Sequence, residues 1–149
     1  MKAVIQRVSE ADVSIDGQIV GAIKQGYMVL LGVARDDTEK DIEKLSRKMI
    51  SLRIFQDQAG KTNLSLQDVG GQLLIVSQFT LLADCRKGRR PSFVKAGDPA
   101  EAKRLYERFI EVCQEQVEVV EHGEFGADMK ISLINDGPFT IVLDSNELN

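Results

Sequence analysis

The chain has 149 residues, of which 43% are apolar and 28% charged, which fits one globular domain with its own core and excludes an intrinsically disordered protein. Its net charge of −4 at pH 7 would not draw the whole molecule to nucleic acid, so any RNA contact has to be local. The longest apolar run, at 27–34, is far shorter than the roughly 20 residues of a membrane span, and the first residues are too interrupted for a signal peptide. We therefore expect a cytoplasmic protein without a membrane segment.

Cysteine and histidine are too scarce to indicate metal chemistry. Cys85 and Cys113 are the two cysteines, no CxxC motif occurs, and His122 is the single histidine. We expect free thiols, no disulfide and no metal. The GxSxG, HExxH, P-loop and GxGxxG fingerprints are also missing, so an enzyme built on this chain needs unusual machinery.

Stretches of β-forming residues alternate with turn signals at the start of the chain. They lie at 3–8, 12–15, 18–23 and 27–34. Asp16-Gly17, between the second and third stretches, is a strong hairpin signal. The pattern predicts an antiparallel meander that enters the core.

A helix is predicted next, because polar and acidic residues at 36–39 can cap free N–H groups and suit the first helical turn. Apolar residues then recur at spacings of three and four, as on one helix face: Ile42, Leu45, Met49 and Leu52. The polar, glycine-bearing stretch at 56–71 predicts an irregular loop or a short hairpin. A central strand is predicted at 71–79.

A second helix has a clear start, with Asp98 as N-cap and Pro99 at the first helical position. Its buried stripe consists of Ala102, Leu105, Tyr106, Phe109 and Cys113. Further strands are predicted at 117–123, 129–135 and 139–144. Because strands outnumber helices and do not alternate regularly with them, we predict an α+β fold in a single domain over 1–149. It would hold a mainly antiparallel or mixed sheet, or a barrel-like core, with two amphipathic helices.

Polar residues directly follow the apolar run LLIV at 73–76, namely Ser77, Gln78 and Thr80. They could simply end a strand, with the hydroxyls bonding nearby backbone groups. Alternatively they could form a hydrolytic site, which needs a base and donors for the oxyanion. The sequence offers little as a base, because His122 lies in a charged turn without an evident acid to orient it.

A basic run comes next: Arg86, Lys87, Arg89 and Arg90, followed by Phe93. Arginine forks suit phosphate oxygens, so the run indicates either an RNA contact or a solvated charged loop. The segment Asn135-Asp136-Gly137-Pro138 has a composition typical of a turn. Pro138 cannot donate the hydrogen bond of the simplest Asp-Gly hairpin, and the sequence alone does not decide whether the Gly-Pro bond is cis.

Several motifs together carry a resemblance that spans nearly the whole chain: MKAVIQRVSEADVSIDG at 1–17, SQFTL at 77–81, GRRPSF at 88–93 and KISLINDGPFTIVLD at 130–144. In this order they resemble the D-aminoacyl-tRNA deacylase family, once called D-tyrosyl-tRNA deacylase. The resemblance implies a cytosolic homodimer with active sites at the interface and without metal or organic cofactor. The implied reaction is hydrolysis of the ester that joins a D-amino acid, or glycine, to the 3′ end of tRNA.

The same resemblance implies roles for particular residues. Gly137 and Pro138 match a cis Gly-Pro motif that reaches into the other subunit's pocket. Backbone carbonyls held near the substrate Cα would leave no room for an L side chain, whereas a D side chain points away and glycine has none. In this setting our own hypothesis for the basic run is that Arg86, Lys87, Arg89 and Arg90 hold phosphates of the tRNA acceptor end.

For the reaction itself two mechanisms stay open. In one, Thr80 is the nucleophile with Ser77 in support. In the other, water attacks with help from the 2′-OH of the terminal adenosine, and backbone N–H groups around Gln78, Phe79 and Thr80 bind the substrate. We favour the second because Thr80 has no evident base and an aminoacyl ester is already activated. Rival hypotheses are a non-catalytic RNA-binding protein and a small-molecule esterase acting through Ser77 or Thr80.

Overall fold

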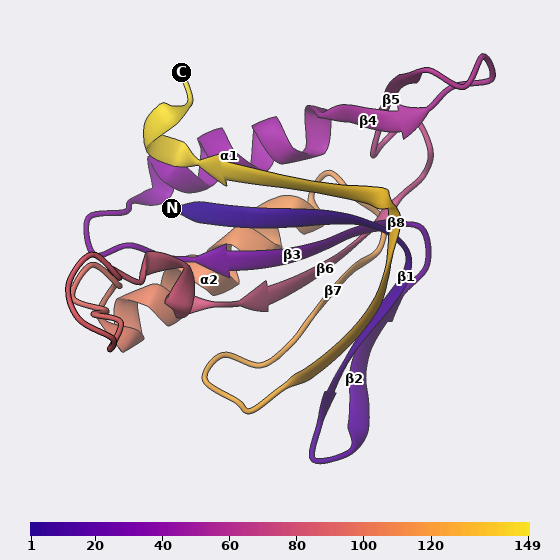
Figure 1. Ribbon diagram of the computed structural model, residues 1–149. Coiled ribbons are helices and arrows are strands. Elements are labelled where there is room, and N and C mark those ends of the chain that lie inside the picture. The colour runs from indigo at the N-terminus through magenta and orange to yellow at the C-terminus, as the bar shows by residue number, and fades with distance from the viewer.

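A long first strand organises the main sheet of the computed structural model, which describes residues 1–149 (Figure 1). One edge of β1 pairs with β3 near its start and with β2 near its end, while β8 follows its other edge. Next to β3 lie β6 and then β7, both joined in parallel, so the six-stranded sheet is mixed. The bounds are β1 Lys2–Ile15, β2 Gln18–Ile23, β3 Gly26–Gly32, β6 Gln72–Ser77, β7 Val120–His122 and β8 Lys130–Asp144.

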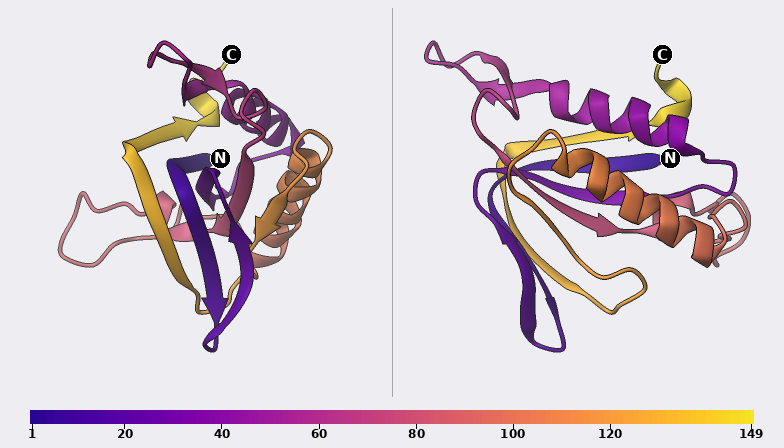
Figure 2. Two further views of the ribbon diagram at one scale, coloured as in Figure 1. Left: turned by 90° about the vertical axis from the view of Figure 1, so that its right-hand side faces the viewer. Right: turned by 180° about the vertical axis from the view of Figure 1, so that it is seen from behind.

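Both predicted helices form, and both cover the same face of the sheet (Figure 2). Helix α1 spans Glu39–Ser51 and begins with a capping box, in which the Thr38 N–H donates to Asp41 Oδ2 at 2.8 Å. Helix α2 spans Pro99–Gln114. Its N-cap is Asp98, as predicted, with the side chain accepting from the Ala100 N–H at 3.2 Å.

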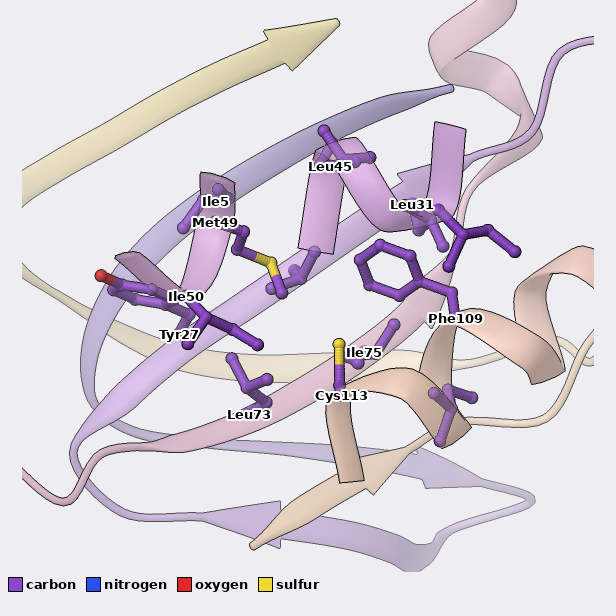
Figure 3. Packing of buried hydrophobic residues seen from close by; sticks show 14 of the residues in the cluster. Ile5, Tyr27, Leu31, Leu45, Met49, Ile50, Leu73, Ile75, Phe109 and Cys113 are labelled. Carbon is purple, nitrogen blue, oxygen red and sulfur yellow. The ribbon is translucent and has the colours of Figure 1, made fainter. Parts of the chain in front are cut away.

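The core lies between the two helices and the sheet (Figure 3). Leu73 and Ile75 of β6 point into it, while Leu74 and Val76 join a second apolar cluster on the opposite face of the sheet. Burial on both faces explains the uninterrupted apolar run in this strand. Burial also raises the pKa of the Cys113 thiol to about 12, which makes this cysteine a packing residue.

The predicted α+β class is confirmed, but two pairs of predicted strands are single strands. The stretches at 3–8 and 12–15 are continuous in β1, and those at 129–135 and 139–144 are continuous in β8. The two long strands pair with each other from end to end, and register shifts take up the irregular residues. The turn-like composition at 135–138 therefore marks a bulge within a strand.

Two more boundaries differ from the prediction. The stretch at 56–71 contributes to a small hairpin of β4, Arg53–Gln56, and β5, Thr62–Ser65. The central strand stops at Ser77, and Phe79–Leu82 form a 3-10 helix, η1. The strand ends here because β3, its pairing neighbour, ends at Gly32. None of the helices is long and apolar enough to cross a membrane.

Candidate active site

The polar residues after β6 form a tight turn at one end of the sheet. Ser77 and Gln78 are half-buried, whereas Thr80 is exposed and Phe79 is 54% exposed. The Gln78 N–H donates to Leu31 O at 2.8 Å and so belongs to the sheet. The N–H groups of Phe79 and Thr80 open the 3-10 helix, where no acceptor exists within the helix. Of the three backbone donors that the sequence suggested, two are left for a ligand.

The hydroxyl of Thr80 is not paired with a base. It accepts a hydrogen bond from Gln78 Nε2 at 2.5 Å. His122 lies on β7 opposite Ile75, and its Nδ1 donates to Gly123 O at 2.6 Å. No group of three or more His, Cys, Asp or Glu side chains is placed to hold a metal ion. The geometry therefore favours backbone donors over an activated hydroxyl.

A cavity of about 280 Å³ adjoins this turn. Its wall is partly apolar and partly polar, because it runs from the end of β6 to the segment that leads into β8. The lining residues include Ser77, Gln78, Phe79, Phe125, Asp128 and Met129. The aromatic and thioether side chains offer flat and adaptable apolar contacts beside the polar turn.

The bulge in β8 is the second part of the predicted site. The Gly137-Pro138 bond is cis, and Gly137 has φ +130°. Residues 136–139 have no ladder partner on β1, because the register passes from the Gln6–Thr140 pair to the Val8–Asn135 pair. Asn135 brackets the bulge, since its Oδ1 accepts from the Phe139 N–H at 2.6 Å and its Nδ2 donates to Phe139 O at 3.2 Å.

Arg7 holds the same bulge from beneath and was missed by the sequence interpretation. It is only 7% exposed, its Nε donates to Asp136 O at 3.0 Å and its Nη1 donates to Ile54 O at 2.5 Å. The guanidinium also lies over the Phe139 ring, 4.7 Å from the centroid. A Cβ on Gly137 would sit 2.6 Å from Arg7 Nη2, so a side chain there would displace the guanidinium.

A signal for Arg7 was present in the sequence. The alternation along β1 places it on the same face as Ala3 and Ile5, both fully buried. A buried arginine needs acceptors. The acceptors are backbone carbonyls from β8 and β4, which a single strand pattern does not reveal.

The basic run forms a hairpin-like loop next to the Ser77–Thr80 turn. Its base is closed by two backbone hydrogen bonds between Asp84 and Ser92, of 2.7 and 2.9 Å. Arg86 forks onto the Asp84 carboxylate, and these hydrogen bonds hold the pKa of Asp84 well below its usual range. Phe93 packs edge-on against Phe79 at 5.0 Å, which joins the loop to the turn. Lys87, Arg89 and Arg90 are exposed and without ion-pair partners.

One chain does not bring the turn and the bulge together. Ser77 pairs with Leu31, which lies opposite Ala3 of β1, whereas the bulge lies beside Arg7. Four residues along β1 and three strand spacings across separate them by roughly 20 Å. They therefore lie at different ends of the sheet, and β8 bends sharply within its length (Figure 1).

Known proteins resemble this chain over nearly its whole length. The sequence profile of the family described as D-Tyr-tRNA(Tyr) deacylase matches residues 4–144. A D-aminoacyl-tRNA deacylase from Kosmotoga olearia is 58% identical over 147 residues, 99% of each chain. A solved c-Myc DNA Unwinding Element Binding Protein is 41% identical, with a TM-score of 0.92 over 97% of this chain and 98% of that one. A probable eukaryotic D-amino acid tRNA deacylase, 18% identical, shares the fold with a TM-score of 0.85 over 95% of this chain and 97% of that one.

Proposed function

The chain belongs to the D-Tyr-tRNA(Tyr) deacylase family, and from this premise we propose that it hydrolyses the ester of D-aminoacyl-tRNA, and of glycyl-tRNA, in the cytoplasm. The products are free amino acid and tRNA. The observation that carries the proposal is the bulge at 136–139, whose backbone has no ladder partner and is held by Arg7 and Asn135. A rigid backbone feature can read the configuration of an α-carbon without reading the side chain.

The selectivity follows from what the bulge offers. Gly137 and Pro138 present carbonyl oxygens and no ladder partners, and Pro138 has no N–H. Carbonyls fixed near the substrate Cα exclude an L side chain in two ways. The side chain would clash with the carbonyl oxygens, and it would shield these oxygens from water. A D side chain points away, and glycine has none to exclude. Substrates with different D side chains are accepted for the same reason.

For the chemical step we favour attack by water, assisted by the 2′-OH of the terminal adenosine. The Phe79 and Thr80 N–H groups would stabilise the oxyanion that develops on the ester carbonyl. The Thr80 hydroxyl accepts from Gln78 and contacts no base, which supports a shaping role. In the alternative, Thr80 is the nucleophile and Ser77 assists it.

The surroundings of the turn suit the 3′ end of a tRNA. The 280 Å³ cavity beside Phe79 is lined by Phe125 and Met129, which suits the terminal base and sugar. The neighbouring loop offers Lys87, Arg89 and Arg90 for the preceding phosphates. Arg86 contributes less free charge, because it is forked onto Asp84.

A homodimer would complete the site. Since the turn and the bulge of one chain are roughly 20 Å apart, the bulge would act in the pocket of a second subunit. Apolar side chains on β8 support such an interface, because Ile134 is 54% exposed and Val142 is 68% exposed. The open edge of β8, which pairs only with β1, adds unpaired backbone groups to the same surface.

The direct test is to incubate the protein with D-aminoacyl-, L-aminoacyl- and glycyl-tRNA and to measure release of amino acid. We expect release from the D and glycyl substrates and none from the L substrate. A small-molecule esterase would show little chiral preference. A nucleic-acid-binding protein, the class named by the DNA-binding relative of known structure, would bind tRNA and release nothing.

Action in trans is tested by complementation between two defective chains. In a Gly137→Ala chain the bulge of β8 is displaced and cannot act on the substrate. A Phe79→Pro chain lacks one backbone N–H donor in the turn. Co-expressed chains should recover about a quarter of the wild-type activity, because half of the dimers are mixed and each mixed dimer has one intact site. No recovery, with mixed dimers present, would place both elements in one chain's site.

A further inference from the structure

The outward face of α1 is strongly basic. Four residues, at successive spacings of four, three and one, lie on the side of the helix opposite the core: Lys40, Lys44, Arg47 and Lys48. None of them forms an ion pair or donates a side-chain hydrogen bond, whereas Glu39 of the same helix pairs with α2. The charge of this basic stripe is therefore free.

The two helices differ in how they handle positive charge. On α2, Lys103, Arg104 and Arg108 all pair with glutamates. The stripe on α1 has one nearby carboxylate that is not otherwise engaged, Glu43, at its flank. In a chain whose net charge is −4, four cations without ion-pair partners on one helix face form a local field of opposite sign.

Helix electrostatics explain only part of the stripe. Cations in the last turn are favoured by the helix dipole, which accounts for Lys48. Lys40 lies in the first turn, where the dipole disfavours a cation. Lys40 therefore adds to the positive potential of this helix face but does not stabilise the helix.

The basic stripe and the basic loop lie at the same end of the molecule but on different sides of it. The loop and the start of α1 share one end of the sheet in Figure 1, whereas the left view of Figure 2 shows the loop projecting away from α1. Between them, Arg35 and Lys95 are adjacent, since the Arg35 N–H donates to Lys95 O at 3.1 Å. Both side chains are exposed and without ion pairs, although Asp36 lies beside them. This pair adds positive charge to the end of the molecule at which α1 begins.

We propose that the basic stripe on α1 binds phosphates of the double-helical acceptor stem of the tRNA substrate. This inference rests on the proposed function, because the loop would hold the single-stranded 3′ end and the stripe the duplex behind it. From Lys40 to Lys48 the helix rises about 12 Å, a length over which one strand of a duplex carries roughly three or four phosphates. A row of cations without aromatic neighbours suits a phosphate backbone and reads no bases.

The test compares two substrates that differ in length. One is full D-aminoacyl-tRNA, and the other is a D-amino acid esterified to adenosine, which has no stem. The stripe variant neutralises the four cations of α1: Lys40→Gln, Lys44→Gln, Arg47→Gln, Lys48→Gln. The matched control removes the same charge from exposed positions elsewhere: Lys24→Gln, Lys61→Gln, Lys103→Gln, Lys130→Gln.

With the stripe neutralised, kcat/KM for the full tRNA should fall at least about tenfold at 50 mM salt, and the salt slope should flatten by roughly 2 to 4. Hydrolysis of the adenosine ester should stay unchanged, and the matched control should keep both activities. A conservative variant, Lys40→Arg, Lys44→Arg, Lys48→Arg, retains the charge and should keep the tRNA affinity of the wild type.

Equal effects of the stripe variant and the matched control, or an equal loss on both substrates, would overturn the inference. If the wild-type protein hydrolyses neither substrate, the proposed function fails. The inference is then decided by the affinity for uncharged tRNA, which the stripe variant should still weaken relative to the control.

Discussion

The bulge of β8 and the turn after β6 are built in opposite ways. The bulge is held from below by a buried guanidinium and from the side by Asn135. The turn is more open, because Phe79 and Thr80 are exposed. Its contacts are the Gln78–Leu31 sheet hydrogen bond, the Gln78–Thr80 side-chain hydrogen bond and the packing of Phe79 on Phe93. A backbone feature that excludes one stereoisomer by contact has to be rigid. A turn that donates N–H groups to the substrate has to be open to it. Substitutions in the two regions should therefore have different consequences.

The largest effect on rate alone is expected in the turn, for Phe79→Pro. Proline removes one N–H at the first position of the 3-10 helix, where its φ is tolerated. Loss of one oxyanion donor should lower kcat by about 10²- to 10³-fold. The ratio of D to L hydrolysis should stay high, and Phe79→Leu, which keeps the N–H, controls for the lost ring. A thermal melt unchanged by Phe79→Pro separates this effect from unfolding.

Gly137→Ala should affect both stability and selectivity. The new Cβ would meet Arg7 Nη2 at 2.6 Å, and the φ of +130° disfavours an L residue. Displacing the guanidinium breaks its hydrogen bonds, so we expect a loss of about 2 to 3 kcal/mol in denaturant unfolding. The displaced bulge should lower kcat/KM for D-aminoacyl-tRNA about 10²-fold, because the substrate is no longer positioned correctly.

Gly60→Ala is the matched control for this substitution. Gly60 also has positive φ, +75°, but nothing lies within 4 Å of its Cβ position. It should lose only about 1 kcal/mol through backbone strain and keep full activity. If both alanines cost the same, the contact with Arg7 has no role in holding the bulge.

Arg7→Lys should loosen the bulge without deleting it. Lysine keeps the charge but cannot fork between Asp136 O and Ile54 O, and it loses the planar contact with Phe139. One buried carbonyl left unpaired costs about 1 to 3 kcal/mol. We expect the preference for D over L substrates to fall about tenfold, while turnover of glycyl-tRNA changes less because glycine has no side chain to exclude. An unaltered ratio would separate Arg7 from selection.

Thr80→Ala distinguishes the two mechanisms. If the hydroxyl only shapes the turn, kcat should fall about tenfold or less, whereas removal of a catalytic nucleophile costs on the order of 10⁶. The exposed side chain makes an effect on stability small. Single-turnover kinetics at saturating enzyme report the chemical step directly, and trapping of an acyl-enzyme would contradict attack by water.

The smallest effects are expected in the basic loop. Lys87→Gln, Arg89→Gln and Arg90→Gln together should flatten the salt dependence of KM by roughly 2, at about 0.7 per phosphate of a single strand. Arg86→Gln alone should change it less, because Arg86 is already paired with Asp84. If Arg86→Gln has the larger effect, the Arg86–Asp84 pair opens on tRNA binding, and the unpaired charges of the loop do not contact phosphates.

Local signals in the sequence determined most of the secondary structure. Helix caps at Thr38 and Asp98, the Asp16-Gly17 turn and the alternation in β1 are each decided by neighbouring residues. The polar turn after β6 was also visible, because hydroxyl and amide groups interrupt an apolar run. Pro138 excluded a simple hairpin, since it has no N–H to donate.

Only the tertiary structure decided how these pieces meet. Pairing with β1 along its length turned two predicted strands into the continuous β8, and acceptors distant in the sequence gave the buried Arg7 its contacts. The separation of the bulge from the turn follows from strand order, which depends on contacts distant in sequence. Local propensities act over a few residues, whereas register, strand order and buried polar partners depend on the free energy of the whole packed chain.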